Sequence, residues 1–85
     1  MLTDKEWSQI RTAWLAAKSY ELSRTYVGAW VKITVKAAPP CWRPAKAIIR
    51  LEYRGPLCSY SSQWFDHVAD VRAALERMEG KNDGR

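Results

Sequence analysis

Hydrophobic and polar residues alternate along two stretches in the middle of the chain. Every second residue from Val27 to Val35 is apolar, and the same alternation returns from Ala47 to Tyr53. A period of two with β-branched residues on the apolar side is typical of a strand that is buried on one face only. The stretch from Tyr26 to Arg54 therefore predicts an antiparallel β-hairpin with one apolar face.

Helical periodicity precedes the hairpin. Thr3 or Asp4 can cap a first helix, with Glu6 at the spacing of a capping box, and the pattern predicts a helix that extends to about Arg24. Its main apolar stripe consists of Trp7, Ile10, Trp14 and Ala17, and a neighbouring strip holds Leu15 and Leu22.

The two apolar strips of this first helix are separated by Arg11 and Lys18. These cations either extend along the margin of the core, as long basic side chains commonly do, or belong to a surface that is left for a partner. The first interpretation is favoured.

A second amphipathic helix follows the hairpin. Ser61 or Ser62 can cap it, and Gly80 is expected to end it. Apolar residues recur in steps of four and three at Trp64, Val68, Val71, Leu75 and Met78. Such a stripe also suits a coiled-coil seam, but two heptads are short for one, so packing against the core is the better interpretation.

These elements predict a small single domain of the α+β class in α-β-β-α order. Residues 1–80 are expected to form one compact unit, with both helices packed on the apolar face of the antiparallel hairpin and residues 81–85 as a disordered tail. A two-stranded sheet is marginal by itself, so a homodimer that pairs sheet edges or faces is a second expectation.

The polar face of the hairpin is the main candidate binding surface. It combines one tryptophan with five cations, namely Trp30, Lys32, Lys36, Lys46, Arg50 and Arg54, with Ile48 among them and Glu52 as its one acid. A solvated face that protects the sheet from aggregation is the alternative interpretation. The excess of positive charge and the tryptophan favour a binding surface.

The connection between the strands is rich in proline. Three prolines between Ala37 and Ala45 restrict the backbone and predict a stiff, protruding loop that carries Trp42 and Arg43. Tryptophan and arginine dominate the energetics of many protein interfaces, so both residues are candidate partner-binding residues. Alternatively, Trp42 folds back onto the core.

Composition narrows the class of partner. The chain of 85 residues has a net charge of +5 and five tryptophans, which a core of this size cannot fully bury. A basic surface favours an acidic protein, nucleic acid or a membrane surface. No apolar run is long enough to span a membrane, so membrane insertion is not expected.

Catalytic and metal-binding signatures are missing from the sequence. His67 is the single histidine and has no nucleophile at a recognisable spacing, so we expect no enzymatic activity and no catalytic residues. Cys41 and Cys58 with one histidine do not supply four metal ligands, and no cofactor motif is present. The chain reaches the polar run Thr3-Asp4-Lys5-Glu6 almost at once, with no basic segment followed by an apolar one, which argues against a secretory leader. A cytoplasmic protein with two reduced thiols is expected.

The sequence thus predicts a small non-catalytic protein-binding module. A regulator or inhibitor that occludes a partner's acidic or apolar surface fits best, and accessory proteins of phages and plasmids are often of this size. The alternative is a nucleic-acid-binding protein in which the cations of the polar face track phosphates while Trp30 and Tyr26 stack on bases.

Overall fold

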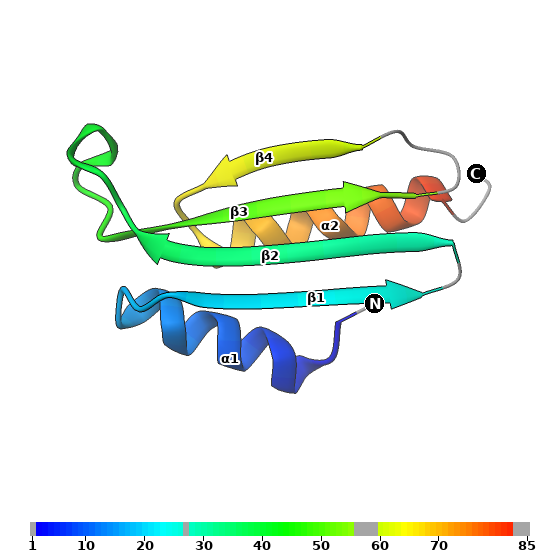
Figure 1. Cartoon of the computed structure of the whole chain (residues 1–85), viewed down its shortest axis with the longest axis horizontal. Helices are drawn as coiled ribbons and strands as arrows, with labels where there is room; N and C mark the ends of the chain where they lie inside the picture. Colours follow the sequence, from blue (N-terminus) through cyan, green and yellow to red (C-terminus); the bar gives the residue numbers. More distant parts are fainter. Residues whose placement is uncertain (1, 27, 56–59, 83–85) are drawn as a thin grey trace.

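The computed structural model describes residues 2–26, 28–55 and 60–82. Two helices enclose four strands and a short 3-10 turn in the chain order α1 (Asp4–Leu15), β1 (Tyr20–Tyr26), β2 (Ala29–Ala37), η1 (Pro40–Trp42), β3 (Ala47–Arg54), β4 (Ser61–Phe65) and α2 (Val68–Asn82). The strands form one antiparallel sheet in which each strand lies beside its neighbour in sequence (Figure 1). The predicted α+β class is confirmed, but the sheet has two strands more than the predicted hairpin.

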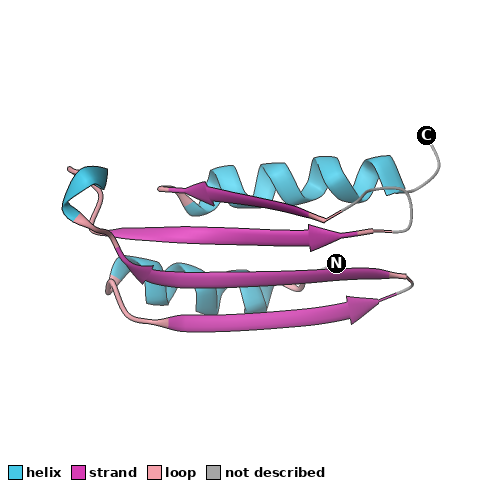
Figure 2. Cartoon of the chain, turned by 45° about the horizontal axis from the view of Figure 1, so that its top comes forward, coloured by secondary structure: helices cyan, strands magenta, loops and turns pink. Residues whose placement is uncertain are grey.

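One face of the sheet carries the core. Val31, Ile33, Ile49 and Leu51 are at most 1% exposed and pack with apolar residues of both helices. Helix α1 contributes Trp7 and Ile10, and helix α2 contributes Val71, Ala74 and Leu75. Both helices therefore cover the same face, as the alternation predicts, and they lie on the same side of the strands in Figures 1 and 2. Val27, Cys58 and the side chain of Tyr26 lie outside the described residues.

Helix α1 begins as the sequence predicts and ends earlier. The amide of Glu6 donates to Thr3 Oγ1 at 3.2 Å, and the amide of Thr3 donates to Glu6 Oε1 at 3.0 Å, which completes the capping box. The predicted end near Arg24 is wrong, because Ala17 adopts a left-handed conformation with φ of 51°. The amide of Lys18 then donates to the carbonyl of Ala13 at 3.0 Å, which closes the helix after Leu15.

Strand β1 occupies the segment that the helical prediction extended into. Its residues Tyr20 and Leu22 lie opposite Val35 and Ile33 of β2, on the core face of the sheet. Arg24 lies on the same face, opposite Val31. An inward-facing arginine interrupts the apolar alternation, and Leu22 happens to fit the helical spacing, so the strand was misread as helix.

Strand β4 and the start of α2 also differ from the prediction. Helix α2 begins at Val68 and extends to Asn82, past Gly80. Trp64 is therefore a strand residue, paired with Arg50 of β3, and the helical stripe begins at Val68. Because the sheet has four strands, the marginal stability that motivated pairing between two copies no longer applies.

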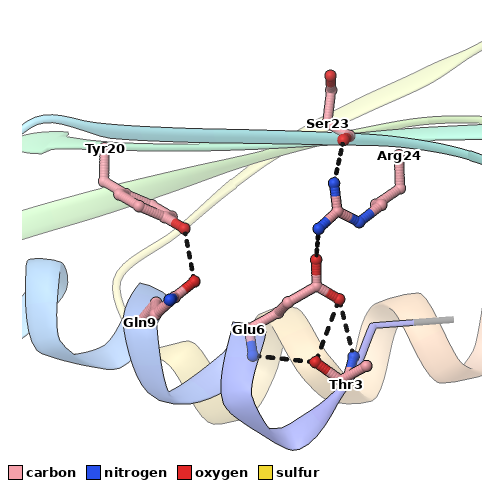
Figure 3. A network of polar contacts seen from close by, with 6 residues as sticks. All are labelled: Thr3, Glu6, Gln9, Tyr20, Ser23 and Arg24. Carbon is pink, nitrogen blue, oxygen red and sulfur yellow. Dashed lines mark hydrogen bonds and ion pairs between the residues drawn. The ribbon is translucent and has the colours of Figure 1, made fainter.

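An ion pair attaches α1 to β1. Arg24 contacts the largely buried carboxylate of Glu6, and the guanidinium of Arg24 also donates to the carbonyl of Ser23 at 3.3 Å (Figure 3). The hydrogen bond from the backbone of Thr3 and the positive charge of Arg24 lower the pKa of Glu6, against the opposing effect of burial. Nearby, the hydroxyl of Tyr20 donates to Gln9 Oε1 at 3.2 Å and adds a second link between the two elements.

Candidate functional site

The sheet face that the helices leave uncovered is the candidate site, and we call it the open face. Strand register places Trp30 opposite Arg54 and Lys32 opposite Glu52 on this face, with Arg50 beside Thr34. Lys36 shares this side of β2. Lys46 directly precedes β3, and its carbonyl accepts from the amide of Ala38 at 3.0 Å, so the pairing of the two strands continues to Lys46 and its side chain follows the alternation of β3. The structure thus brings together the six predicted residues of the hairpin, and β1 adds a second acid, Glu21.

Strand β4 adds an aromatic centre to the open face that the sequence prediction missed. The Lys36 Nζ lies 4.8 Å from the centroid of the Trp64 ring, and the guanidinium carbon of Arg50 lies 5.7 Å from it. Trp64 is 36% exposed and Tyr60, just before the strand, is 45% exposed. A tryptophan ring between two cations attracts both through its negative face, so the three side chains stabilise one another.

Hydrogen bonds hold Arg50 in place. Its Nε donates to Ser62 Oγ at 3.0 Å and its terminal nitrogen donates to Tyr60 Oη at 3.4 Å. The hydroxyl of Tyr60 in turn donates to Glu52 Oε2 at 2.7 Å, and Glu52 also lies 3.7 Å from the Arg50 Nε. This network orders Arg50, Tyr60 and Glu52 before any partner arrives. We call Trp64, Arg50 and Tyr60 the aromatic centre.

Ile48 is only 2% exposed although its side chain belongs to the open face and is outside the main core cluster. Lys36 lies directly opposite Ile48 on β2, while Trp64 lies on β4, on the other side of β3. Contact between Lys36 and Trp64 therefore requires their side chains to meet above β3, beside Ile48. The bridge thus passes beside a buried apolar residue on an otherwise polar face.

Charge is distributed unevenly over the open face. Lys32 pairs with Glu21 at 3.5 Å and Arg50 pairs with Glu52, so these two cations have acidic neighbours. No acid of the described residues lies within ion-pair distance of Lys36, Lys46 or Arg54. The middle of the open face is thus close to neutral, whereas cations without a counter-charge lie towards its two ends.

The proline-rich connection forms a protrusion at one end of the sheet (Figure 1). The amide of Trp42 donates to the carbonyl of Pro39 at 2.9 Å, and the amide of Ala45 donates to the carbonyl of Trp42 at 2.9 Å. Trp42 is half-buried, between the two alternatives that the sequence left open, whereas Arg43 is exposed. These two predicted residues therefore lie beyond the end of the open face and not over its centre.

Other chemistry within the described residues is limited. His67 packs against Trp14, with ring centroids 5.1 Å apart. No group of three or more histidine, cysteine or acidic side chains within residues 2–26, 28–55 and 60–82 could hold a metal ion. In the same part of the chain, no helix is both long and apolar enough to cross a lipid bilayer.

Cys41 in η1 is an exposed free thiol. We expect it to react with Ellman's reagent in the native protein, because an exposed thiol meets the reagent without unfolding. Cys41→Ser is the matched control: if native wild-type protein releases no more chromophore than this variant, Cys41 is not accessible in solution.

Comparisons of the chain with protein-family models, with curated proteins and with solved structures find no match.

Proposed function

We propose that this protein is a non-catalytic protein-binding module that occludes an acidic surface of a partner through its open face. The observation that carries the proposal is the aromatic centre, in which Arg50 and Tyr60 are held by hydrogen bonds beside an exposed Trp64. Tryptophan, tyrosine and arginine are the residue types enriched at interface hot spots. Side chains that are already ordered lose little conformational entropy on binding, which favours affinity.

The arrangement of charge supports an acidic protein partner. Interfaces commonly have a closely packed centre surrounded by a polar rim, and rim charges mainly steer association. Here the near-neutral aromatic centre is flanked by Lys36, Lys46 and Arg54, with exposed Arg43 on the adjoining protrusion. A partner with an apolar pocket and an acidic margin complements this arrangement.

The same charges make nucleic acid the weaker interpretation. Phosphate binding draws its affinity from cations that release counterions, but Lys32 and Arg50 already have acidic neighbours on the face. A nucleic acid strand would also pass close to Glu21 and Glu52, which repel phosphate.

The size of the open face fits a regulator that acts by blocking. The eight residues of β3 span about 26 Å, and the four strands extend over about 14 Å from the first axis to the last. Together with the protrusion at η1, an area of this size suits a small, transient interface. A surface of this kind can cover a functional region of a partner without chemistry of its own.

The test begins with affinity capture from the source cell under nuclease treatment and continues with the purified partner. We expect Trp64→Ala to weaken binding about 30-fold or more, which corresponds to the loss of a hot-spot residue. Trp42→Ala and Arg43→Ala test the protrusion in the same assay and are also expected to weaken binding. Charge reversal of Lys36 or Arg54 should mainly slow association.

Thr12→Ala is the matched control, because Thr12 is exposed on α1, on the side of the molecule away from the open face. Thermal melting confirms that each variant is folded at the assay temperature. If capture depends on nucleic acid, or if affinity falls steeply with salt while Trp64→Ala binds normally, the protein-binding proposal is wrong and nucleic-acid binding takes its place.

A further inference from the structure

A groove of about 710 Å³ lies between α1 and α2, on the side of the molecule away from the open face. Trp7, Trp14 and Leu15 line it from α1, and Val68 lines it from α2. Leu15 is 66% exposed, more than any other large apolar residue among those described. A second hollow of about 390 Å³ shares Trp14 and Leu15 and extends the groove towards the base of the η1 protrusion.

Two contacts of α1 with the segment from His67 to Arg72 lie along the groove. At one end, Arg72 contacts Asp4 at 3.2 Å and its guanidinium carbon lies 5.6 Å from the centroid of the Trp7 ring. At the other end, Trp14 packs against His67. Asp4 and Trp14 are ten positions apart on α1, which corresponds to about 15 Å along the helix axis. An elongated apolar groove of this length accommodates about three turns of a helix.

Both margins of the groove carry a cation. Arg11 is exposed on α1 and has no acid within ion-pair distance among the described residues. Arg72 on α2 is 47% exposed at its side chain. It pairs with Asp4, which also lines the groove, and lies over the Trp7 ring, but its one hydrogen bond to Asp4 leaves most of its five N–H donors available. A ligand with an apolar centre and acids on both flanks therefore complements the groove.

We propose that this groove binds an acidic amphipathic helix of a partner protein. The apolar stripe of that helix covers Trp14 and Leu15, and glutamates on its two flanks meet Arg11 and Arg72. Amphipathic helices are commonly recognised in apolar grooves through side chains at three- and four-residue spacing. A second copy of this chain is a poorer occupant, because joining two copies through this groove brings both pairs of arginines into one interface.

The proposal is independent of the open face and gives the module two binding surfaces on opposite sides. Its test uses a capped model peptide of about 14 residues, long enough to fill the groove, with leucines at helical spacing and glutamates on the flanks. A second peptide has lysine in place of each glutamate, and a third has two central prolines that prevent a helix. Binding is followed by amide chemical shifts of the ¹⁵N-labelled protein and by helix formation in circular dichroism.

We expect the glutamate peptide to gain helicity and to shift amides of α1 and the first turns of α2, while the lysine and proline peptides bind at least about tenfold more weakly. Leu15→Glu should also weaken the binding of the glutamate peptide at least about tenfold. Thr12→Glu is the matched control, since it places the same charge on the same helix outside the groove, and it should bind like the wild type.

Several results would overturn the proposal. These are equal binding of the lysine peptide, an equal loss in Thr12→Glu, shifts confined to the open face, or no shift in the groove. A wild-type dimer that Leu15→Glu converts to a monomer in analytical ultracentrifugation would assign the groove to a second copy instead. None of these outcomes bears on Trp64, so the function of the open face is tested separately.

Discussion

Arg24→Ala is expected to destabilise the protein by about 2–3 kcal/mol, a large effect for a side chain that is half exposed. The substitution leaves the Glu6 carboxylate at the interface of α1 and β1 without its cation. Removing one partner of a largely buried ion pair costs more than the pair itself contributes, because the remaining charge loses its compensation. Urea denaturation near neutral pH measures the difference.

The dependence on pH follows from the lowered pKa of Glu6. Its value in the folded protein lies below the ordinary 4.5, so ionised Glu6 stabilises the fold above that pH. The contribution disappears as the pH falls through the folded value, where both states are protonated. Glu6→Gln retains the capping-box geometry without the charge. Its deficit in unfolding free energy should therefore be constant near neutral pH and shrink below about pH 4.5.

Arg72→Ala is the matched control for Arg24→Ala. It removes another arginine that joins two elements, but the acid it contacts, Asp4, is 94% exposed at its side chain. Exposed ion pairs contribute little, so we expect a loss below about 1 kcal/mol. Equal losses in the two arginine variants, or a Glu6→Gln deficit that grows in acid, would contradict this role of the Glu6–Arg24 pair.

Ile49→Ala is expected to cost about 3–4 kcal/mol, and the same change at the adjacent Ile48 about 1–2 kcal/mol. Ile49 is fully buried among core residues of both helices and the sheet, so its truncation leaves a cavity that cannot collapse. Ile48 lies beside the bridge between Lys36 and Trp64, whose long side chains can settle into the vacated space. Denaturation of both variants under one condition gives the comparison.

A double-mutant cycle tests directly whether this bridge covers Ile48. Trp64→Ala should reduce the cost of Ile48→Ala, because Ile48 is then already exposed, and should leave the cost of Ile49→Ala unchanged. Equal costs at the two positions, or no coupling between Trp64 and Ile48, would show that the bridge over β3 does not bury Ile48 in solution.

The sequence predicted those elements in which a single period dominates. The alternation around Ile33 and Leu51 correctly predicted which side chains of β2 and β3 face the core. The spacing of Thr3 and Glu6 predicted the capping box. In both cases the local pattern and the tertiary contacts require the same residue types. The α+β class and the common side of the two helices followed from these elements.

Elements whose residues fit two periods could not be predicted. Leu22 satisfies a helical stripe and a strand, and Arg24 faces inward only because Glu6 lies across from it on another element. Trp64 lies four positions before Val68, so it seemed to begin the helical stripe. A usable signal was the run from Tyr60 to Phe65, which is rich in serine and aromatic residues and favours a strand over a helix.

The same ambiguity between helical and strand periods limited the prediction of the candidate site. The five cations and the tryptophan of the hairpin were correctly predicted to share one face, because their positions follow from the alternation of β2 and β3. The aromatic centre was missed, since Trp64 and Tyr60 reach the open face only through pairing of β4 with β3. Once the run from Tyr60 to Phe65 was assigned to a helix, this pairing could not be inferred.

The order of elements along the chain has a consequence for folding during synthesis. Each strand pairs with the strand before it, so hairpins can close over short loops as the polypeptide leaves the ribosome. Helix α2, however, follows the entire sheet and supplies Val71, Ala74 and Leu75 to the core. Until these residues are synthesised, the inner side of β3 has only α1 to shield it, and a nascent chain stalled before Val68 would be prone to aggregate.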